Sequence, residues 1–206
     1  MVVRDYMSSQ VITIDPQCAI ADARTLLRKH RIRQIPVVHK DRLVGIITDR
    51  DLRSTSAATK TVGEVMTAEP TVIRPMAPID EVARVLRKLK VGALPVVDDH
   101  KLVGIITTAD VLDAFVEFCG VTEPTYHLIL GVSGGTDTKW RVRRIIDQKR
   151  GDLKWIYRDR RSGKLQLRLK ATHVDDIVSA LEAEGFEVSK ILSPPASGRS
   201  SGTRST

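Results

Sequence analysis

Two short motifs in the chain combine a hydroxyl and a carboxylate at the same spacing. Thr48 and Asp51 form the first Thr-x-x-Asp pair, and Thr107 and Asp110 form the second. If each pair begins a helix, the backbone N–H groups there point outward and favour an anion. The carboxylate can accept hydrogen bonds from the vicinal hydroxyls of a ribose, and the threonine can donate one to a phosphate. The alternative is structural, because Thr is a common N-cap and Asp suits a helix's first turn.

Both motifs belong to an internal repeat. Leu43–Thr48 recurs as Leu102–Thr107, and Ile35–Val38 has its counterpart in Leu94–Val97, each 59 residues further along the chain. Because no insertion is needed to align them, the first 120 residues are two copies of one unit. We place the copies at residues 1–59 and 60–120.

Each copy predicts the elements that must position its motif. A short extended segment, residues 11–14 or 71–73, ends near a proline and is followed by an amphipathic helix. Two apolar, β-branched runs separated by a polar turn then predict a pair of buried strands. A second helix begins after Thr48 or Thr107. The unit is therefore β-α-β-β-α, and the fold class is α/β (α+β).

The repeated sequence resembles a known family. The hydrophobe-Pro-Val-Val strand and the Gly-Ile-Ile-Thr-x-x-Asp segment are similar to those of the CBS domain, which occurs as a tandem pair called a Bateman module. The resemblance covers residues 1 to about 118. It implies that an adenosyl ligand (AMP, ADP, ATP or S-adenosylmethionine) binds between the repeats, with no required cofactor.

Carried over by position, the resemblance implies two ligand sites. In the first, Thr48 and Asp51 hold ribose and phosphate, and the phosphates also face Arg33 and Gln34, with Arg50 nearby. The adenine pocket of this site consists of Met66, Thr71, Val91 and Gly92. The second consists of Thr107, Asp110, Met7, Ile12 and Ile32, with the uncharged Gly92 and Ala93 facing the phosphates.

The two sites are expected to differ in charge. The first has guanidinium groups at Arg33 and Arg50, where the second has Gly92 and Ala109. Because arginine binds phosphate through charge-assisted hydrogen bonds, we expect the first site to prefer phosphorylated nucleotides. The alternative for Arg33 is a solvated charge within the basic stretch 28–33.

After residue 120 a different pattern begins. Alternating apolar runs and two amphipathic stretches predict a β-α-β-β-α-β domain over residues 121–192, which is the ferredoxin-like order. This order resembles the ACT domain, whose effectors bind near the first strand-to-helix loop, here 133–137. A CBS pair followed by such a domain resembles the AcuB-type acetoin-utilisation regulators. Residues 193–206 lack large apolar side chains and are expected to form a disordered tail.

The charge balance suits acidic partners. The net charge is +8, of which +6 comes from residue 121 onward. Aromatic and basic side chains interleave in Trp155–Arg161, so nucleic-acid binding by the C-terminal domain is the alternative function. Against it, Trp155 and Tyr157 share one face of a strand while Ile156 takes the other, and a charged hairpin tip is usually solvated.

The remaining features exclude several protein classes. No apolar run approaches the ~18–20 residues of a membrane span, and the first residues lack a signal-peptide pattern. The two cysteines and five histidines show no metal-ligand spacing, and no catalytic motif is present. Inosine-monophosphate dehydrogenases also contain CBS pairs, but their catalytic barrel needs about 200 or more further residues. We expect a non-enzymatic, cytoplasmic regulatory sensor that forms a homodimer and regulates a partner protein, without nucleic acid or membrane.

Overall fold

The computed structural model describes residues 1–55, 60–131 and 137–192. The chain divides into two compact units, Met1–Ala114 and Phe115–Thr206. The expected disordered tail, 193–206, lies outside the described residues, as does most of the predicted effector loop, 133–136. Among the helices of the described part, none combines the length and apolar character needed to cross a membrane.

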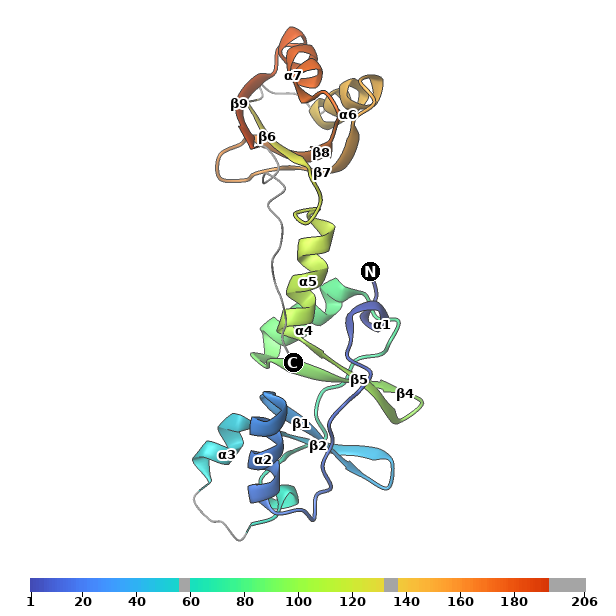
Figure 1. Cartoon of the computed structure of the whole chain (residues 1–206), viewed down its shortest axis with the longest axis vertical. Coiled ribbons are helices and arrows are strands. Elements are labelled where there is room, and N and C mark those ends of the chain that lie inside the picture. Colours follow the sequence, from blue (N-terminus) through green and yellow to red (C-terminus); the bar gives the residue numbers. More distant parts are fainter. Residues whose placement is uncertain (56–59, 132–136, 193–206) are drawn as a thin grey trace. The chain divides into compact units, whose positions relative to one another are not determined.

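Each repeat of the first unit contains a helix, a two-stranded hairpin and a second helix, as the sequence predicts (Figure 1). In the first repeat these are α2 (Ile20–His30), β1 (Gln34–His39), β2 (Arg42–Thr48) and α3 (Asp49–Ser54). In the second repeat they are α4 (Ile79–Leu89), β4 (Ala93–Asp98), β5 (Lys101–Thr107) and α5 (Thr108–Phe118). The hairpins share one register, since Val37 lies opposite Gly45 and Val96 opposite Gly104.

The predicted strand before each first helix is reduced to a single bridging residue. The Ile14 N–H donates to the Pro36 carbonyl at 3.2 Å, and the Ile14 carbonyl accepts from the Val38 N–H at 2.9 Å. Extending this parallel ladder toward residue 12 requires an N–H on Pro36, and extending it beyond Ile14 requires an N–H on Pro16. Proline has no backbone N–H, so the ladder stops in both directions. The second repeat has the same arrangement at Ile73, Pro95 and Pro75.

The cores of the two repeats are completed by exchanged segments. The short helix α1 (Val3–Tyr6) precedes the first repeat in sequence, yet Val3 is fully buried in the core of the second repeat. The 3-10 turn η1 (Val62–Glu64) precedes the second repeat, yet Val62 is fully buried in the core of the first. The repeat seen in the sequence and the unit that packs together are therefore different stretches of chain.

A glycine in each hairpin allows a methionine to lie over the strand. A side chain at Gly45 would collide with the Met66 sulfur and approach the Thr67 carbonyl of β3 (Thr67–Ala68) to 3.1 Å. Gly104 has the same relation to Met7. Each methionine consequently packs against the core beneath it, Met66 in the first repeat and Met7 in the second.

The second unit has the element order β-α-β-β-α-β. Its elements are β6 (Tyr126–Gly131), α6 (Thr138–Gln148), β7 (Asp152–Arg158), β8 (Leu165–Lys170), α7 (Val174–Ala183) and β9 (Glu187–Leu192). The strands form one antiparallel sheet in the order β7-β8-β6-β9, with α6 and α7 on one face (Figure 1). Alternate residues of β8 are fully buried beneath these helices: Leu165, Leu167 and Leu169.

Two local hydrogen bonds hold the Asp15 carboxylate ahead of α2. It accepts from the Gln17 backbone N–H at 2.9 Å and lies 3.0 Å from His39 Nδ1. The Gln17 bond, followed by the His39 bond, lowers the pKa of Asp15 below its ordinary value of 3.8. Because the folded-state pKa lies below the unfolded-state value, the stabilisation is complete above about pH 5 and is lost as the pH falls through the folded-state pKa.

We therefore expect Asp15→Asn to lower the melting temperature at pH 7 and to lose this deficit as the pH falls toward 3. Thermal melts of the variant and the wild type across this range measure the difference. Asp41→Asn, which changes an exposed carboxylate in the hairpin turn, is the control. A deficit for Asp15→Asn that stays constant from pH 7 to pH 3 contradicts the expectation.

Candidate functional site

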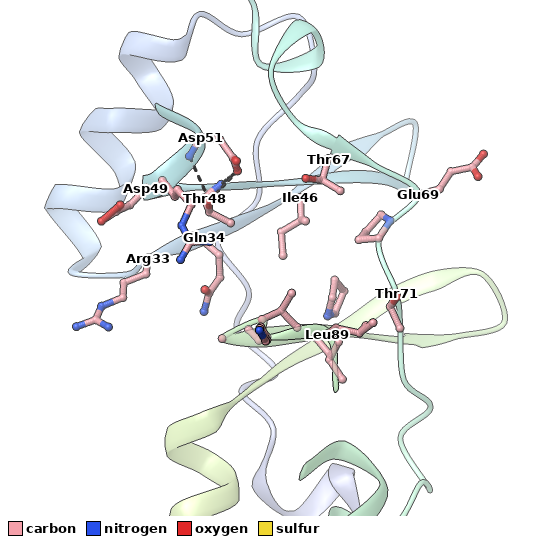
Figure 2. Close-up of a pocket in the computed structure, with 18 of the residues that line it drawn as sticks. Arg33, Gln34, Ile46, Thr48, Asp49, Asp51, Thr67, Glu69, Thr71 and Leu89 are labelled. Atoms are coloured by element: carbon pink, nitrogen blue, oxygen red, sulfur yellow. Dashed lines mark hydrogen bonds between the residues drawn. The ribbon is translucent and has the colours of Figure 1, made fainter. Parts of the chain in front are cut away.

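A cavity of about 810 Å³ is formed by both repeats of the first unit (Figure 2). The first repeat contributes the residues that begin β1, the end of β2 and the first turns of α3. Opposite them lie the chain from β3 to Thr71, the end of α4 and the beginning of β4. The first Thr-x-x-Asp motif is thus at a strand-to-helix junction that borders a cavity.

Thr48 and Asp51 are joined by three hydrogen bonds at this junction. The Thr48 N–H and Oγ1 donate to Asp51 Oδ2 at 2.8 and 2.7 Å, and the Asp51 N–H donates to Thr48 Oγ1 at 3.4 Å. Thr48 is therefore the N-cap of α3, as predicted. Asp51 Oδ1 accepts no hydrogen bond from the described residues, so one carboxylate oxygen remains available to a ligand hydroxyl.

Most residues predicted for the first site border this cavity. They are Arg33, Gln34, Thr48, Arg50, Asp51, Thr71, Val91 and Gly92. Met66 does not border it, because its side chain lies over Gly45 and packs against the core of the first repeat. Figure 2 shows Arg33 and Glu69 at opposite ends of the cavity, with Thr48 and Asp51 on the Arg33 side.

Four cations and three carboxylates border the cavity. The cations are Arg33, Arg50, Arg53 and Lys90, and the carboxylates are those of Asp49, Asp51 and Glu69. Asp49 and Arg53 are paired at 2.9 Å across one turn of α3. The sequence analysis missed this pair, although an acid followed four residues later by an arginine on a short helix was a usable signal.

The second Thr-x-x-Asp motif has the same local geometry. The Thr107 N–H and Oγ1 donate to Asp110 Oδ2 at 2.6 and 2.8 Å. Neither residue borders the 810 Å³ cavity, and nor do Met7 and Ile12. The second ligand site accordingly stays a prediction.

A second hollow of about 510 Å³ lies on the first repeat between α2 and α3. We call it the α2–α3 groove; it is bordered by Arg24, Leu27, Arg28, Ile32, Asp49, Leu52 and Arg53. It contains Ile32, which the sequence analysis had assigned to the second ligand site. Asp49 and Arg53, which form an ion pair, border both the cavity and the groove.

The aromatic residues of the β7–β8 hairpin contact neighbours within their own unit. Trp155 Nε1 donates to the Cys119 carbonyl at 3.0 Å, and the ring meets His127 edge-on with centroids 5.4 Å apart. Tyr157 lies 5.5 Å from Trp155 between ring centroids. Trp155 and Tyr157 thus share one face of the sheet, while Ile156 packs against the core on the other, as the alternation predicts.

Comparison with known proteins identifies both repeats. The CBS domain model matches residues 3–57 and 62–117. The chain is 34% identical over 113 residues to the CBS domain-containing protein YhcV of Bacillus subtilis, covering 52% of this chain and 81% of YhcV. It is 36% identical over 142 residues to inosine-5'-monophosphate dehydrogenase of the same organism, covering 65% of this chain. That match spans 29% of the dehydrogenase, less than a third of its length.

Solved structures match the first unit. The CBS domain pair of MJ0100, in complex with 5'-methylthioadenosine and S-adenosyl-L-methionine, is 34% identical with a TM-score of 0.54, covering 57% of this chain and 97% of its own. CBSX2 of Arabidopsis thaliana in complex with AMP is 32% identical with a TM-score of 0.53, covering 56% and 96%. A putative acetoin utilization protein (AcuB) of Vibrio cholerae is 32% identical with a TM-score of 0.54, covering 60% and 96%.

The internal repeat, the residues matched by the family model and the fold shared with solved structures all indicate the same family. The two family matches together cover more than half of the chain. The chain therefore belongs to the CBS-domain family, of which it contains a tandem pair.

Proposed function

We propose that the protein is a non-enzymatic regulatory sensor that binds an adenine nucleotide in the cavity bordered by Thr48 and Asp51. The observation that carries this proposal is the free Asp51 Oδ1 at a cavity with four surrounding cations. Asp51 accepts hydrogen bonds from the ribose hydroxyls, and the backbone around Val91 and Thr71 borders the space for the adenine. The complexes of MJ0100 and CBSX2 with adenosyl ligands support this class of ligand.

Within that class, the charge of the cavity favours phosphorylated nucleotides. Arg33, Arg50 and Arg53 correspond in the second repeat to Gly92, Ala109 and Leu112, none of which is charged. Guanidinium groups bind phosphate oxygens through charge-assisted, geometrically specific bonds. The first site therefore binds AMP, ADP or ATP more tightly than S-adenosylmethionine, whose sulfonium carries a positive charge.

The second unit is proposed to be an ACT-like domain with the ferredoxin-like fold. Its β-α-β-β-α-β order and its antiparallel β7-β8-β6-β9 sheet support this assignment. With the CBS pair, it gives an arrangement like that of AcuB-type regulators. We propose a cytoplasmic homodimer in which nucleotide binding shifts the population between two arrangements of the protein. A regulated partner protein then responds to that shift.

Calorimetric titration of the full chain with adenosine, AMP, ADP, ATP and S-adenosylmethionine tests the ligand. We expect AMP to bind at least tenfold more tightly than adenosine, because only AMP has a phosphate for the arginines. Arg33→Gln should remove most of this difference and leave adenosine binding unchanged. Arg42→Gln, which changes an exposed arginine at the start of β2, is the matched control. Equal affinity for adenosine and AMP would contradict the phosphate preference, and no binding of any of the five would contradict the function.

A further inference from the structure

The sheet of the second unit has a face that α6 and α7 do not cover, and the interior strand β8 places basic side chains on it (Figure 1). Successive residues of a strand point to opposite faces of a sheet. Leu165, Leu167 and Leu169 are buried beneath the helices, so the residues that alternate with them lie on the other face. They are Lys164, just ahead of the strand, Gln166, Arg168 and Lys170.

Three rings lie beside these side chains. His127 of β6 and Trp155 of β7 both pair with Arg168, so the three residues form one row across the sheet. Tyr157, which is 46% exposed, lies in the next row, opposite Gln166. The centroids of the His127 and Trp155 rings are 5.4 Å apart, and those of Trp155 and Tyr157 are 5.5 Å apart. We call the three rings, with Lys164, Gln166, Arg168 and Lys170, the open sheet face.

The segment that precedes β6 fixes one end of the open sheet face. Trp155 Nε1 donates to the Cys119 carbonyl at 3.0 Å, and Arg168 Nη1 donates to the Thr125 hydroxyl at 3.1 Å. Both side chains are thus held in place before a ligand arrives. Binding to groups that are already ordered costs less conformational entropy, so this arrangement favours association.

Salt bridges neutralise little of the positive charge on this face. Its three cations form none within the described part of the chain. Two carboxylates beside the face, Asp152 and Glu123, are both paired with Lys154, at 3.0 and 3.3 Å. A third, Glu187, lies over Gly131 on the other side of the sheet. The hairpin that follows Tyr157 contains one carboxylate and three exposed arginines: Arg158, Arg160 and Arg161.

We propose that the open sheet face binds a single-stranded nucleic acid. Aromatic rings stack on unpaired bases, whose faces a duplex hides, and the lysine and arginine side chains contact the phosphates. Trp155 and Tyr157 share one face of their strand, and that face lies opposite the core into which Ile156 packs. This revises the expectation, drawn from the sequence, of a protein without a nucleic-acid partner.

Charge favours this occupant over a second copy of the chain. Two copies pressed together through this face would set the β8 cations against their own counterparts, a like-charge arrangement that opposes association. A polyanion has the complementary charge. The inference concerns the second unit and does not depend on nucleotide binding by the first.

Fluorescence anisotropy of a labelled oligouridylate, titrated with the full chain in excess AMP, tests the binding. We expect the strand to bind at least tenfold more tightly than a duplex of the same length. Tyr157→Ala should weaken the binding at least fivefold, because one stacked base loses its ring. Trp140→Ala, which removes an equally prominent aromatic side chain of α6, 62% exposed, is the matched control and should leave the affinity unchanged. Equal affinity for strand and duplex, or equal losses in the two variants, overturns the proposal.

The salt dependence of the affinity tests the phosphate contacts. Lys164→Gln combined with Lys170→Gln should reduce the slope of log affinity against log salt concentration by about 1.4, since each phosphate contact to a single strand contributes about 0.7. Lys139→Gln combined with Lys149→Gln, which changes two exposed lysines of α6 and its end, is the matched control. A slope that both pairs change equally, or that neither changes, contradicts phosphate binding by this face.

The fluorescence of the two tryptophans locates the strand. In Trp140→Phe the remaining tryptophan is Trp155, whose emission should be quenched by saturating oligouridylate. In Trp155→Phe the remaining Trp140 should not respond. Unchanged Trp155 emission would place the strand elsewhere and overturn the proposal. Sedimentation of Tyr157→Ala gives the last outcome: a dimer that dissociates only in this variant shows that a second copy covers the face, which also overturns it.

Discussion

Replacing Asp51 by alanine is expected to weaken AMP binding by at least tenfold, which corresponds to about 1.4 kcal/mol. Hydrogen bonds to a charged group contribute about 1.5–3 kcal/mol each, and the variant removes the acceptor proposed for the ribose hydroxyls. Asp110→Ala should have a smaller effect, because the second motif has no counterpart of Arg33 or Arg50 nearby. Calorimetric titration of AMP into each variant gives the two dissociation constants.

The difficulty with this substitution is that Asp51 also caps α3. A matched control exists in the same unit, because the Thr61 N–H and Oγ1 donate to Glu64 Oε2 at 2.7 and 2.9 Å. Glu64 does not border the cavity. Glu64→Ala should therefore lower the melting temperature about as much as Asp51→Ala while leaving AMP affinity unchanged. If both variants lose affinity equally, Asp51 acts only as a helix cap.

The elements that carry the motif were predictable because their signals are local. Apolar runs around Ile35–Val38 and Leu43–Thr48 predict the hairpin, and Thr48 followed by Asp51 predicts the beginning of α3. The strand before α2 was predicted wrongly because its continuation toward residue 11 depends on a distant neighbour: Ile14 pairs with Val37, and Pro36 beside Val37 has no N–H to extend the ladder. A pattern within residues 11–14 contains no information about that neighbour.

The sequence predicts those residues of the candidate site whose place follows from their position in the repeat. Arg33 and Thr71 border the cavity as the resemblance implies. Met66 does not border the cavity, because its side chain lies over Gly45, and that space becomes visible only when the strands are paired. Arg53 was missed because the sequence analysis considered only the capping turn of α3, and the cavity extends one turn further along that helix.

The exchange of segments between the repeats gives the second large prediction. Val3 and Val62 are both fully buried, each in the core of the repeat that it does not precede. Val3→Ala and Val62→Ala should each lower the free energy of unfolding by about 2 kcal/mol, from the lost apolar burial and the cavity left behind. Chemical denaturation measures this loss, with Val72→Ala as the control, since Val72 is 43% exposed.

Hydrogen exchange followed by mass spectrometry shows where each loss acts. A loss of 2 kcal/mol corresponds to about 30-fold faster exchange through local opening. Val3→Ala should accelerate exchange in β4 and β5 of the second repeat, where Ser8 and Ile105 exchange two backbone hydrogen bonds of 3.0 Å. Val62→Ala should accelerate exchange in β1 and β2 of the first repeat. In that repeat the Cys18 carbonyl accepts a hydrogen bond from the Val62 N–H at 2.8 Å.

The location of the faster exchange distinguishes two ways in which the repeats could pack, which the sequence alone does not distinguish. The offset of 59 residues is preserved whether each leading segment packs on its own repeat or on the other, because Val3 and Val62 correspond in both cases. If the sequence copies were independent packing units, Val3→Ala would affect the first repeat and Val62→Ala the second. In the exchanged arrangement neither repeat has a complete core alone. A change at one repeat's leading segment therefore reaches the other repeat, and with it the wall that this other repeat contributes to the cavity between Thr48 and Gly92.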